Sequence, residues 1–267
     1  MKKNKAVPSI VSLLLIFWLL LPMLATVLYA FSGQWDHSIL PEELTLKWFA
    51  SLFSDPRFIA AMGRTMLLCG SATALGVLFT VPTIFYIVMW HPKWERFLSI
   101  LTVLPYGLPG VVAVVGLLQV YSSGPLAIAG TPWIVLGAYM ISVLPYLYQS
   151  SRNALHGINA RQLVESACLL GASPWRSFLH VIIPGITGGI VSGAILSFSV
   201  LFGEFVLANL LIGGGFETIQ MYLYRRLLES GHTASAVVVV YLIIIALVSY
   251  LLVVFSQSGK THNRREK

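Results

Sequence analysis

Residues 160–184 read ARQLVESACLLGASPWRSFLHVIIP, and the pattern of this stretch organises the rest of the chain. Over residues 160–170, apolar side chains recur at helical spacing opposite polar ones, which predicts an amphipathic helix. Gly171 then stands where the end of a helix favours a residue with positive φ. Ser173-Pro174 is typical of a second helix start, with serine as the N-cap and proline in the first turn. The stretch therefore predicts two short helices joined at a glycine, and residues 160–177 are called the elbow below. The expected apolar face of the first helix consists of Leu163, Val164, Ala167, Cys168 and Leu170, and the polar face of Arg161, Gln162, Glu165 and Ser166.

The segments on either side of the elbow are too apolar for a protein dissolved in water. The 267 residues are 57% hydrophobic and 10% charged, whereas soluble domains carry about a quarter charged residues. A transmembrane helix needs about 20 apolar residues, and six segments meet or approach this length: 10–31, 65–89, 97–121, 133–148, 184–212 and 234–255. We expect an all-α polytopic membrane protein, a single domain over residues 1–267, with a loop at residues 149–183. A soluble enzyme, a disordered regulator and a nucleic-acid-binding domain are excluded.

The basic residues set the expected orientation in the membrane. Most of the 17 Lys and Arg residues lie in the two terminal tails, the turn at residues 91–96 and the loop at residues 149–183. Positive residues concentrate on the cytoplasmic side, so both termini and this loop are expected in the cytoplasm. The net charge of +7 therefore reflects membrane topology. The first span is expected to stay uncleaved, because its apolar run exceeds that of a signal peptide.

The loop also carries a spaced pattern that resembles a known family: Glu165-Ser166-Ala167, three residues, Gly171, nine residues, and Val181-x-Ile183-Pro184. It is similar to the EAA loop of permease subunits in binding-protein-dependent ABC importers, whose pattern is Glu-Ala-Ala, three residues, Gly, nine residues, Ile-x-Leu-Pro. Ser166 replaces an alanine of that pattern, and Val181 and Ile183 are conservative departures. The segment Leu-Pro-Tyr-Gly-Leu-Pro-Gly at residues 104–110 looks like the broken-helix segment of these permeases. The look of the chain is closest to the branch that serves polyamines, ferric iron, sulfate and phosphonates.

The resemblance implies a type I (MetI-like) permease fold and a set of partners. It implies that the elbow contains the coupling helix that docks on a cytoplasmic ABC ATPase dimer, through Glu165, Ser166, Ala167, Gly171, Pro174 and Arg176. It also implies a second permease, identical or homologous, and a periplasmic or lipid-anchored solute-binding protein at the bacterial cytoplasmic membrane. The chain has no phosphate-binding G-x-x-x-x-G-K-[ST] loop, so ATP and Mg²⁺ are expected on the ATPase. No catalytic residue, metal site or bound cofactor is expected in this chain.

Glu204 is an acidic residue well inside an expected span. A buried carboxylate costs several kcal/mol unless it is paired or faces water, so such residues mark transport pathways by default. The other interpretation is a structural hydrogen bond to N–H or hydroxyl groups of a neighbouring helix. The sequence leaves both interpretations open.

Two further features invite an interpretation. Gly185, Gly189 and Gly193 recur every fourth residue, a spacing that lets helices approach closely, and packing within this subunit is favoured over a dimer seam. The outer segment at residues 213–231 contains Arg225 and Arg226. Either arginine is a candidate contact for acidic residues of the binding protein, and solvated loop charges are the alternative.

Two other classes of function are weighed against the importer. An ion-coupled secondary transporter usually shows more buried ionisable groups and an internal repeat. An intramembrane protease needs a base beside its serine, and although Gly171-Ala172-Ser173 superficially resembles a nucleophile motif, all 6 histidines fall in loops or at span borders. Both alternatives leave the pattern in the loop at residues 149–183 unexplained.

Overall fold

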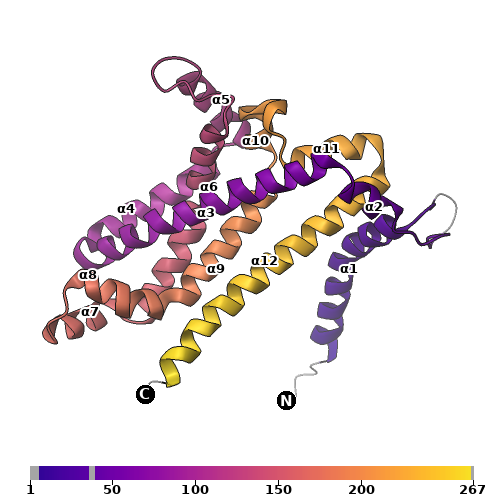
Figure 1. Cartoon of the computed structure of the whole chain (residues 1–267). Helices are drawn as coiled ribbons and strands as arrows, with labels where there is room; N and C mark the ends of the chain where they lie inside the picture. The colour runs from indigo at the N-terminus through magenta and orange to yellow at the C-terminus, as the bar shows by residue number, and fades with distance from the viewer. Residues whose placement is uncertain (1–5, 36–39, 266–267) are drawn as a thin grey trace. The chain divides into compact units, whose positions relative to one another are not determined.

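The structure is a computed structural model that describes residues 6–35 and 40–265. Its regular elements over these residues are helices, and one isolated bridge pairs Ser32 with Leu44. The α-helices in chain order (Figure 1) are α1 (Ala6–Phe31), α2 (Lys47–Phe53), α3 (Pro56–Trp90), α4 (Pro92–Val103), α5 (Gly110–Tyr121), α6 (Pro132–Gly157), α7 (Ala160–Leu169), α8 (Pro174–Ser177), α9 (Ile183–Phe202), α10 (Val206–Leu211), α11 (Ile219–Glu229) and α12 (Gly231–Arg265). Between them lie two 3₁₀ turns, η1 (Leu104–Gly107) and η3 (Gly213–Phe216), and one π-helical turn, η2 (Phe178–Ile182).

The described residues contain 4 helices that are long and apolar enough to cross a membrane, and 5 if one bent pair counts as a span. The four are Val11–Phe31, Pro56–Trp90, Pro174–Phe202 and Gly231–Val254, and the bent pair joins Pro92–Gly107 to Gly110–Tyr121. The prediction of an all-helical polytopic membrane protein is therefore confirmed. The remaining expected span lies within α6, a helix of 26 residues that is not among these candidates. The number of six spans stays a prediction.

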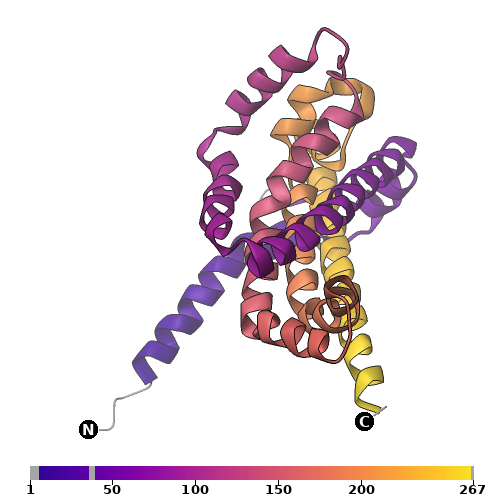
Figure 2. The ribbon, with the colours of Figure 1, turned by 90° about the vertical axis from the view of Figure 1, so that its left-hand side faces the viewer.

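Two of the expected spans are interrupted. The span expected over residues 97–121, in which residues 104–110 resemble a broken-helix segment, bends by 99° between α4 and α5. Figure 2 shows this bend. Pro105 and Pro109 lie at the bend, and proline can neither donate a backbone hydrogen bond nor follow a helical residue without a clash. The segment expected over residues 184–212 is likewise divided, because α9 ends at Phe202 and α10 starts only at Val206.

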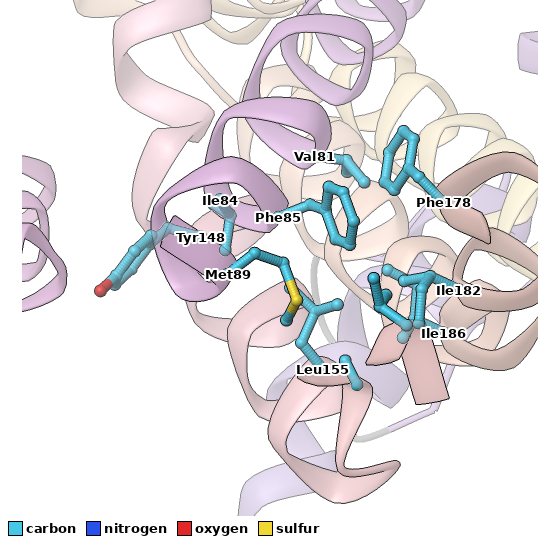
Figure 3. Packing of buried hydrophobic residues seen from close by; sticks show 11 residues of the cluster. Val81, Ile84, Phe85, Met89, Tyr148, Leu155, Phe178, Ile182 and Ile186 are labelled. Carbon is cyan, nitrogen blue, oxygen red and sulfur yellow. The ribbon is translucent and has the colours of Figure 1, made fainter. Parts of the chain in front are cut away.

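The chain divides into two compact units, one of residues 1–60 and 222–244 and the other of residues 61–221 and 245–267. The second unit contains the elbow. Its buried core joins α3, α6, the elbow, η2 and α9 through aliphatic and aromatic side chains (Figure 3), namely Val81, Ile84, Phe85, Met89, Tyr148, Leu155, Ala160, Val164, Phe178, Ile182 and Ile186. The elbow is thus anchored in the same core as the long helices. The expectation of a single domain stays a prediction.

The glycine stripe of α9 packs against α6 of the same chain. A Cβ added at Gly189 or Gly193 would lie closer than 3.0 Å to atoms of Ala154 or Ser150 in α6, a separation that real Cβ atoms essentially never show. The absent side chains therefore let the two helices approach closely. Packing within one subunit, the interpretation favoured from the sequence, is confirmed for this stripe.

In the first unit, aromatic rings fasten the end of α1 to the start of α12. The His232 ring stacks on Tyr29 with centroids 3.9 Å apart and on Trp48 with centroids 5.1 Å apart. His232 Nδ1 lies 3.0 Å from the carbonyl oxygen of Tyr29, and Trp48 Nε1 donates to the carbonyl oxygen of Ser32. These contacts fasten the polar segment between α1 and α2 to the start of α12.

Candidate functional site

The glycine turn of the elbow has the geometry that the sequence predicts. α7 ends at Leu169, and Gly171 has φ +88°. The N–H of Ala172 donates to the carbonyl of Ala167 at 3.0 Å, and the N–H of Gly171 donates to the carbonyl of Cys168 at 3.0 Å. This pair of bonds is a Schellman motif, which satisfies carbonyl groups that the end of a helix leaves unpaired.

The second helix of the elbow begins as predicted. Ser173 is the N-cap of α8, and its Oγ accepts a hydrogen bond from the backbone N–H of Arg176 at 3.2 Å. Pro174 lies in the first turn, where its missing N–H has no partner to lose. The Schellman motif holds one side of the turn between α7 and α8 by backbone hydrogen bonds, and the N-cap holds the other side by a bond from a backbone N–H to a side-chain hydroxyl.

The apolar face of α7 is narrower than the sequence predicts. Ala160 and Val164 are buried in the core and Ala167 is half-buried. These residues follow one another at spacings of four and three, so the buried side chains form a single line along α7. Leu163 and Cys168 were expected on this face but are exposed. Only one line of side chains of α7 therefore meets the core, and the other faces of this helix are exposed.

The tip of the elbow presents large apolar side chains to its surroundings. Leu169 and Leu170 are each 90% exposed. Leu170 was expected on the buried face, but it follows the last helical residue and so leaves the register of α7. Glu165 is exposed beside this tip and pairs with Arg161, one turn earlier, at 3.0 Å. The elbow therefore offers two exposed leucines next to a carboxylate on a fixed scaffold.

The elbow continues into α9 through an irregular turn that the sequence did not indicate. Residues Phe178–Ile182 form the π-helical turn η2, and such turns often mark functional sites. Phe178 is buried and stacks on Phe85 of α3 with centroids 4.4 Å apart. Because α8, η2 and α9 form one unbroken helical run from Pro174 to Phe202, the elbow is directly joined to a membrane-spanning helix.

A hollow of about 410 Å³, called the passage hollow below, lies among α4, α6 and α9. Its lining consists of Ser99, Thr102 and Val103 from α4, Pro145, Tyr146, Tyr148, Gln149, Ser150 and Asn153 from α6, and Leu196 from α9. These side chains are hydroxyl, amide, aromatic or aliphatic, and none of them is charged. No local pattern in the sequence indicated this hollow, because its walls come from three separate helices.

Glu204 lies at the break between α9 and α10 and is not among the residues that line the passage hollow. Its carboxylate accepts hydrogen bonds from the backbone N–H groups of Leu207 at 2.7 Å and Ala208 at 3.1 Å. The hydroxyl of Tyr139 in α6 donates to the same carboxylate at 3.2 Å. N–H and hydroxyl donors are the partners that we expect if Glu204 has a structural role. A role for Glu204 in the transport pathway stays a prediction.

The two arginines of α11 differ in their surroundings. Arg226 forms ion pairs with Asp55 and, at 2.6 Å, with Glu229, and its Nε donates to the Tyr222 hydroxyl at 3.0 Å. Burial alone would raise the pKa of Asp55, but hydrogen bonds from Tyr222, the backbone and Arg226 outweigh it and lower that pKa. Burial and the Asp55 hydrogen bond raise the pKa of Tyr222 to about 12. Arg226 is thus engaged within the chain. Arg225 is more exposed than Arg226.

Comparisons with known proteins agree with this architecture. Residues 72–259 match the family model described as "Binding-protein-dependent transport system inner membrane component". The "Putative 2-aminoethylphosphonate transport system permease protein PhnV" of Salmonella paratyphi A is 30% identical over 235 residues, which are 87% of either chain. The "Spermidine/putrescine transport system permease protein PotB" of Haemophilus influenzae is 26% identical, over 99% of this chain and 96% of the relative.

Solved structures share the fold. A chain of a bacterial ABC transporter involved in the import of the acidic polysaccharide alginate has a TM-score of 0.71, with 96% of both chains covered and 18% sequence identity. A chain of the inward-facing MetNI methionine ABC transporter has a TM-score of 0.63, covering 77% of this chain and 99% of that chain, with 17% identity. At these identities the likeness concerns the fold alone.

Proposed function

The chain belongs to the family of binding-protein-dependent transport system inner membrane components, and from this premise we propose how it takes part in transport. It is a permease subunit of a binding-protein-dependent ABC importer. Membership of this family argues against both alternative functions, the ion-coupled secondary transporter and the intramembrane protease. Ser173, the candidate nucleophile of the protease interpretation, accepts an N-cap hydrogen bond in the elbow instead.

In this proposal the elbow docks on a separate cytoplasmic ABC ATPase, which carries ATP and Mg²⁺. The exposed tip of the elbow supports it, because Leu169 and Leu170 are 90% exposed beside Glu165 on a scaffold held by its own hydrogen bonds. Burying a leucine side chain contributes about 1.5–3 kcal/mol, so a groove that covers both leucines gains substantial binding energy. Glu165, Ser166, Ala167, Gly171, Pro174 and Arg176 form the proposed docking surface.

Docking supplies a mechanical route into the membrane. ATP binding draws the two ATPase subunits together, and each pulls on the elbow that it holds. The elbow is joined to α9 through η2 and anchored by Phe178 in the core, so its displacement carries the inner end of α9. A second permease, identical or homologous, completes the pathway, and a periplasmic or lipid-anchored binding protein delivers solute at the outer face. The proposed site is the bacterial cytoplasmic membrane, with both termini inside.

The proposed cargo is a small polar solute that crosses beside the passage hollow. Relatives at 29–30% identity are named for 2-aminoethylphosphonate, and others are named for polyamines and sulfate, so 2-aminoethylphosphonate is the first solute to test. Hydroxyl and amide groups in the hollow suit hydrogen bonding to a solute of either charge sign. Uptake of labelled 2-aminoethylphosphonate, with putrescine, sulfate and ferric iron as competitors, identifies the class. If labelled 2-aminoethylphosphonate is not taken up, the phosphonate assignment is wrong.

Co-purification tests the docking proposal. The chain is expressed with its chromosomal neighbours, extracted in mild detergent and captured by a tag, and its partners are identified by mass spectrometry. We expect an ATPase with the wild type and a loss of about tenfold or more with Glu165→Lys, because a charge reversal in the centre of an interface costs several kcal/mol. Glu42→Lys, the same reversal in the exposed outer loop, is the matched control. Equal retention of the ATPase by all three proteins would overturn the docking surface.

A further inference from the structure

A charged cluster links α4 to α6 near the elbow, and no sequence pattern indicated it. Glu95 lies in the first turn of α4, and its side chain is only 14% exposed. Its carboxylate accepts a hydrogen bond from Arg152 Nε and lies 3.0 Å from His156 Nε2. The hydroxyl of Tyr148 donates to the backbone carbonyl of Glu95 at 2.9 Å. Glu95, Arg152, His156 and Tyr148 are called the α4 clamp below.

The α4 clamp uses one face of α6. Tyr148, Arg152 and His156 are spaced four residues apart, so they stand above one another on successive turns. Three turns of α6 therefore hold the first turn of α4. The ion pair between Glu95 and Arg152 is sheltered from solvent, unlike the exposed pair between Arg161 and Glu165, so water screens it less.

The position of the clamp relates the elbow to the passage hollow. α6 ends at Gly157, one residue after His156, and α7 follows through Asn159, whose φ is +50°. A second hollow, of about 340 Å³, separates the start of α4 from the start of α7 and is lined by Glu95, His156, Asn159, Arg161 and Gln162 among others. The clamp therefore joins the polar end of α4 to the last turns of α6, and the elbow follows α6 after the short joint at Asn159.

α4 is also one wall of the passage hollow. It contributes Ser99 and Thr102, one and two turns beyond Glu95, to the lining of this hollow. α6 contributes most of the other lining residues and also carries the clamp. A movement of the elbow reaches α6 through the short joint at Asn159. Whether the first turns of α4 follow α6 then depends on the link at Glu95. Beyond the other end of α4, η1 has its own contact with α6, because the Tyr106 hydroxyl donates to the carbonyl oxygen of Ser142 at 3.2 Å.

We propose that Glu95 is a positioning residue for transport: it makes α4 move with α6 when the ATPase displaces the elbow, so that ATP hydrolysis is matched to solute movement. The proposal rests on docking of the ATPase at the elbow. Without the clamp, the elbow still binds the ATPase and still moves, but the α4 wall lags behind. Loss of the clamp therefore uncouples ATP hydrolysis from import, whereas loss of the docking surface prevents assembly.

The test compares hydrolysis with uptake in the complete importer reconstituted in liposomes. Glu95→Gln keeps the shape of the side chain but removes its charge, and Lys93→Gln neutralises an exposed residue of the same turn as the matched control. Glutamine cannot replace the charge-assisted hydrogen bonds to Arg152 and His156, so we expect Glu95→Gln to raise the ATP hydrolysed per solute imported about fivefold or more. We expect Lys93→Gln to match the wild type and all three proteins to retain the ATPase.

A second variant separates a shared contact from general damage. Arg152→Lys keeps the positive charge but removes the guanidinium, and we expect it to uncouple as well. Because both changes break one contact, the double variant is expected to uncouple no more than Glu95→Gln alone. Unchanged ATP consumption per solute in Glu95→Gln and Arg152→Lys, or equal effects of Glu95→Gln and Lys93→Gln, overturns the role of the clamp. A wild-type chain that retains no ATPase overturns the docking proposal itself, and the clamp proposal with it.

Discussion

Replacing Gly171 tests whether the elbow works as a fixed shape. Gly171 has φ +88°, and a Cβ added there meets nothing within 4 Å. The cost of Gly171→Val is therefore conformational and not steric. Holding an L-residue in the left-handed region costs about 1–3 kcal/mol, with a β-branched residue at the upper end. That cost lowers the population of the native elbow roughly 5- to 150-fold, and the affinity for the ATPase falls with it.

The assay is titration of purified ATPase onto nanodiscs that contain the permease. Gly171→Asn is the graded variant, because asparagine tolerates the left-handed region better than other non-glycine residues, and its affinity loss is expected to stay below about fivefold. Gly124→Val is the matched control. Gly124 has φ +86° and equally open surroundings, but it lies in the loop between α5 and α6 and not in the elbow.

The order of the variants decides the matter. If strain in the elbow sets the affinity, valine is worst, asparagine is mild, and Gly124→Val matches the wild type. If Gly171→Asn weakens binding as much as Gly171→Val, the added side chain obstructs the partner and the argument from φ is refuted. Equal losses for Gly171→Val and Gly124→Val would point to general misfolding instead.

Four further outcomes are expected. Glu165→Lys lowers uptake about tenfold or more at unchanged membrane abundance, since it changes an exposed docking surface, and an immunoblot beside the uptake assay checks this. Gly193→Ala lowers the free energy of unfolding, measured by thermal melting, by about 1–3 kcal/mol because the added methyl group collides with α6. Gly116→Ala, where an added methyl group meets nothing, leaves the free energy of unfolding unchanged. The pKa of Asp55 is lowered in the folded protein, so its ionised carboxylate stabilises the fold at pH values above the ordinary pKa of aspartate. This stabilisation is lost as the pH falls through the lowered pKa, and melting curves of Asp55→Asn measured against pH lack that loss. Glu204→Ala removes the carboxylate that caps α10 and lowers the free energy of unfolding by about 0.5–2 kcal/mol in melting experiments. Unchanged stability together with abolished uptake would favour the pathway role of Glu204 instead.

The elbow could be predicted from the sequence because its signals are local. The signals are Gly171 after the end of α7 and the pair Ser173-Pro174 two residues later. The hydrogen bonds that they determine join residues no more than five positions apart. The bend before α5 is local in the same sense, since two prolines lie within it. The burial of α7 was predicted less well, because it depends on how far α6 and α9 extend beneath it, which no periodicity in α7 encodes.

The α4 clamp and the passage hollow could not be predicted, because each joins residues far apart in the chain. Glu95 reads as an ordinary charged residue in a first turn, and its partners Arg152 and His156 lie 57 and 61 residues later. The role of Glu204 was only half predictable for the same reason. Its cap on α10 is local, whereas its contact with Tyr139 comes from a helix 65 residues earlier.

Close packing determines how a displaced elbow acts on the rest of its unit. At Gly189 and Gly193 there is no room for a methyl group between α9 and α6, so the two helices cannot slide past each other without opening a gap. Beyond the breaks, α5 and α10 pack against each other, and Gly110 approaches Val206. Helical hydrogen bonding is interrupted before α5, near Pro105, and before α10, near Glu204. Bending there breaks fewer hydrogen bonds than bending within a helix, so a pull on the elbow moves α6 and α9 together and is taken up at these two breaks.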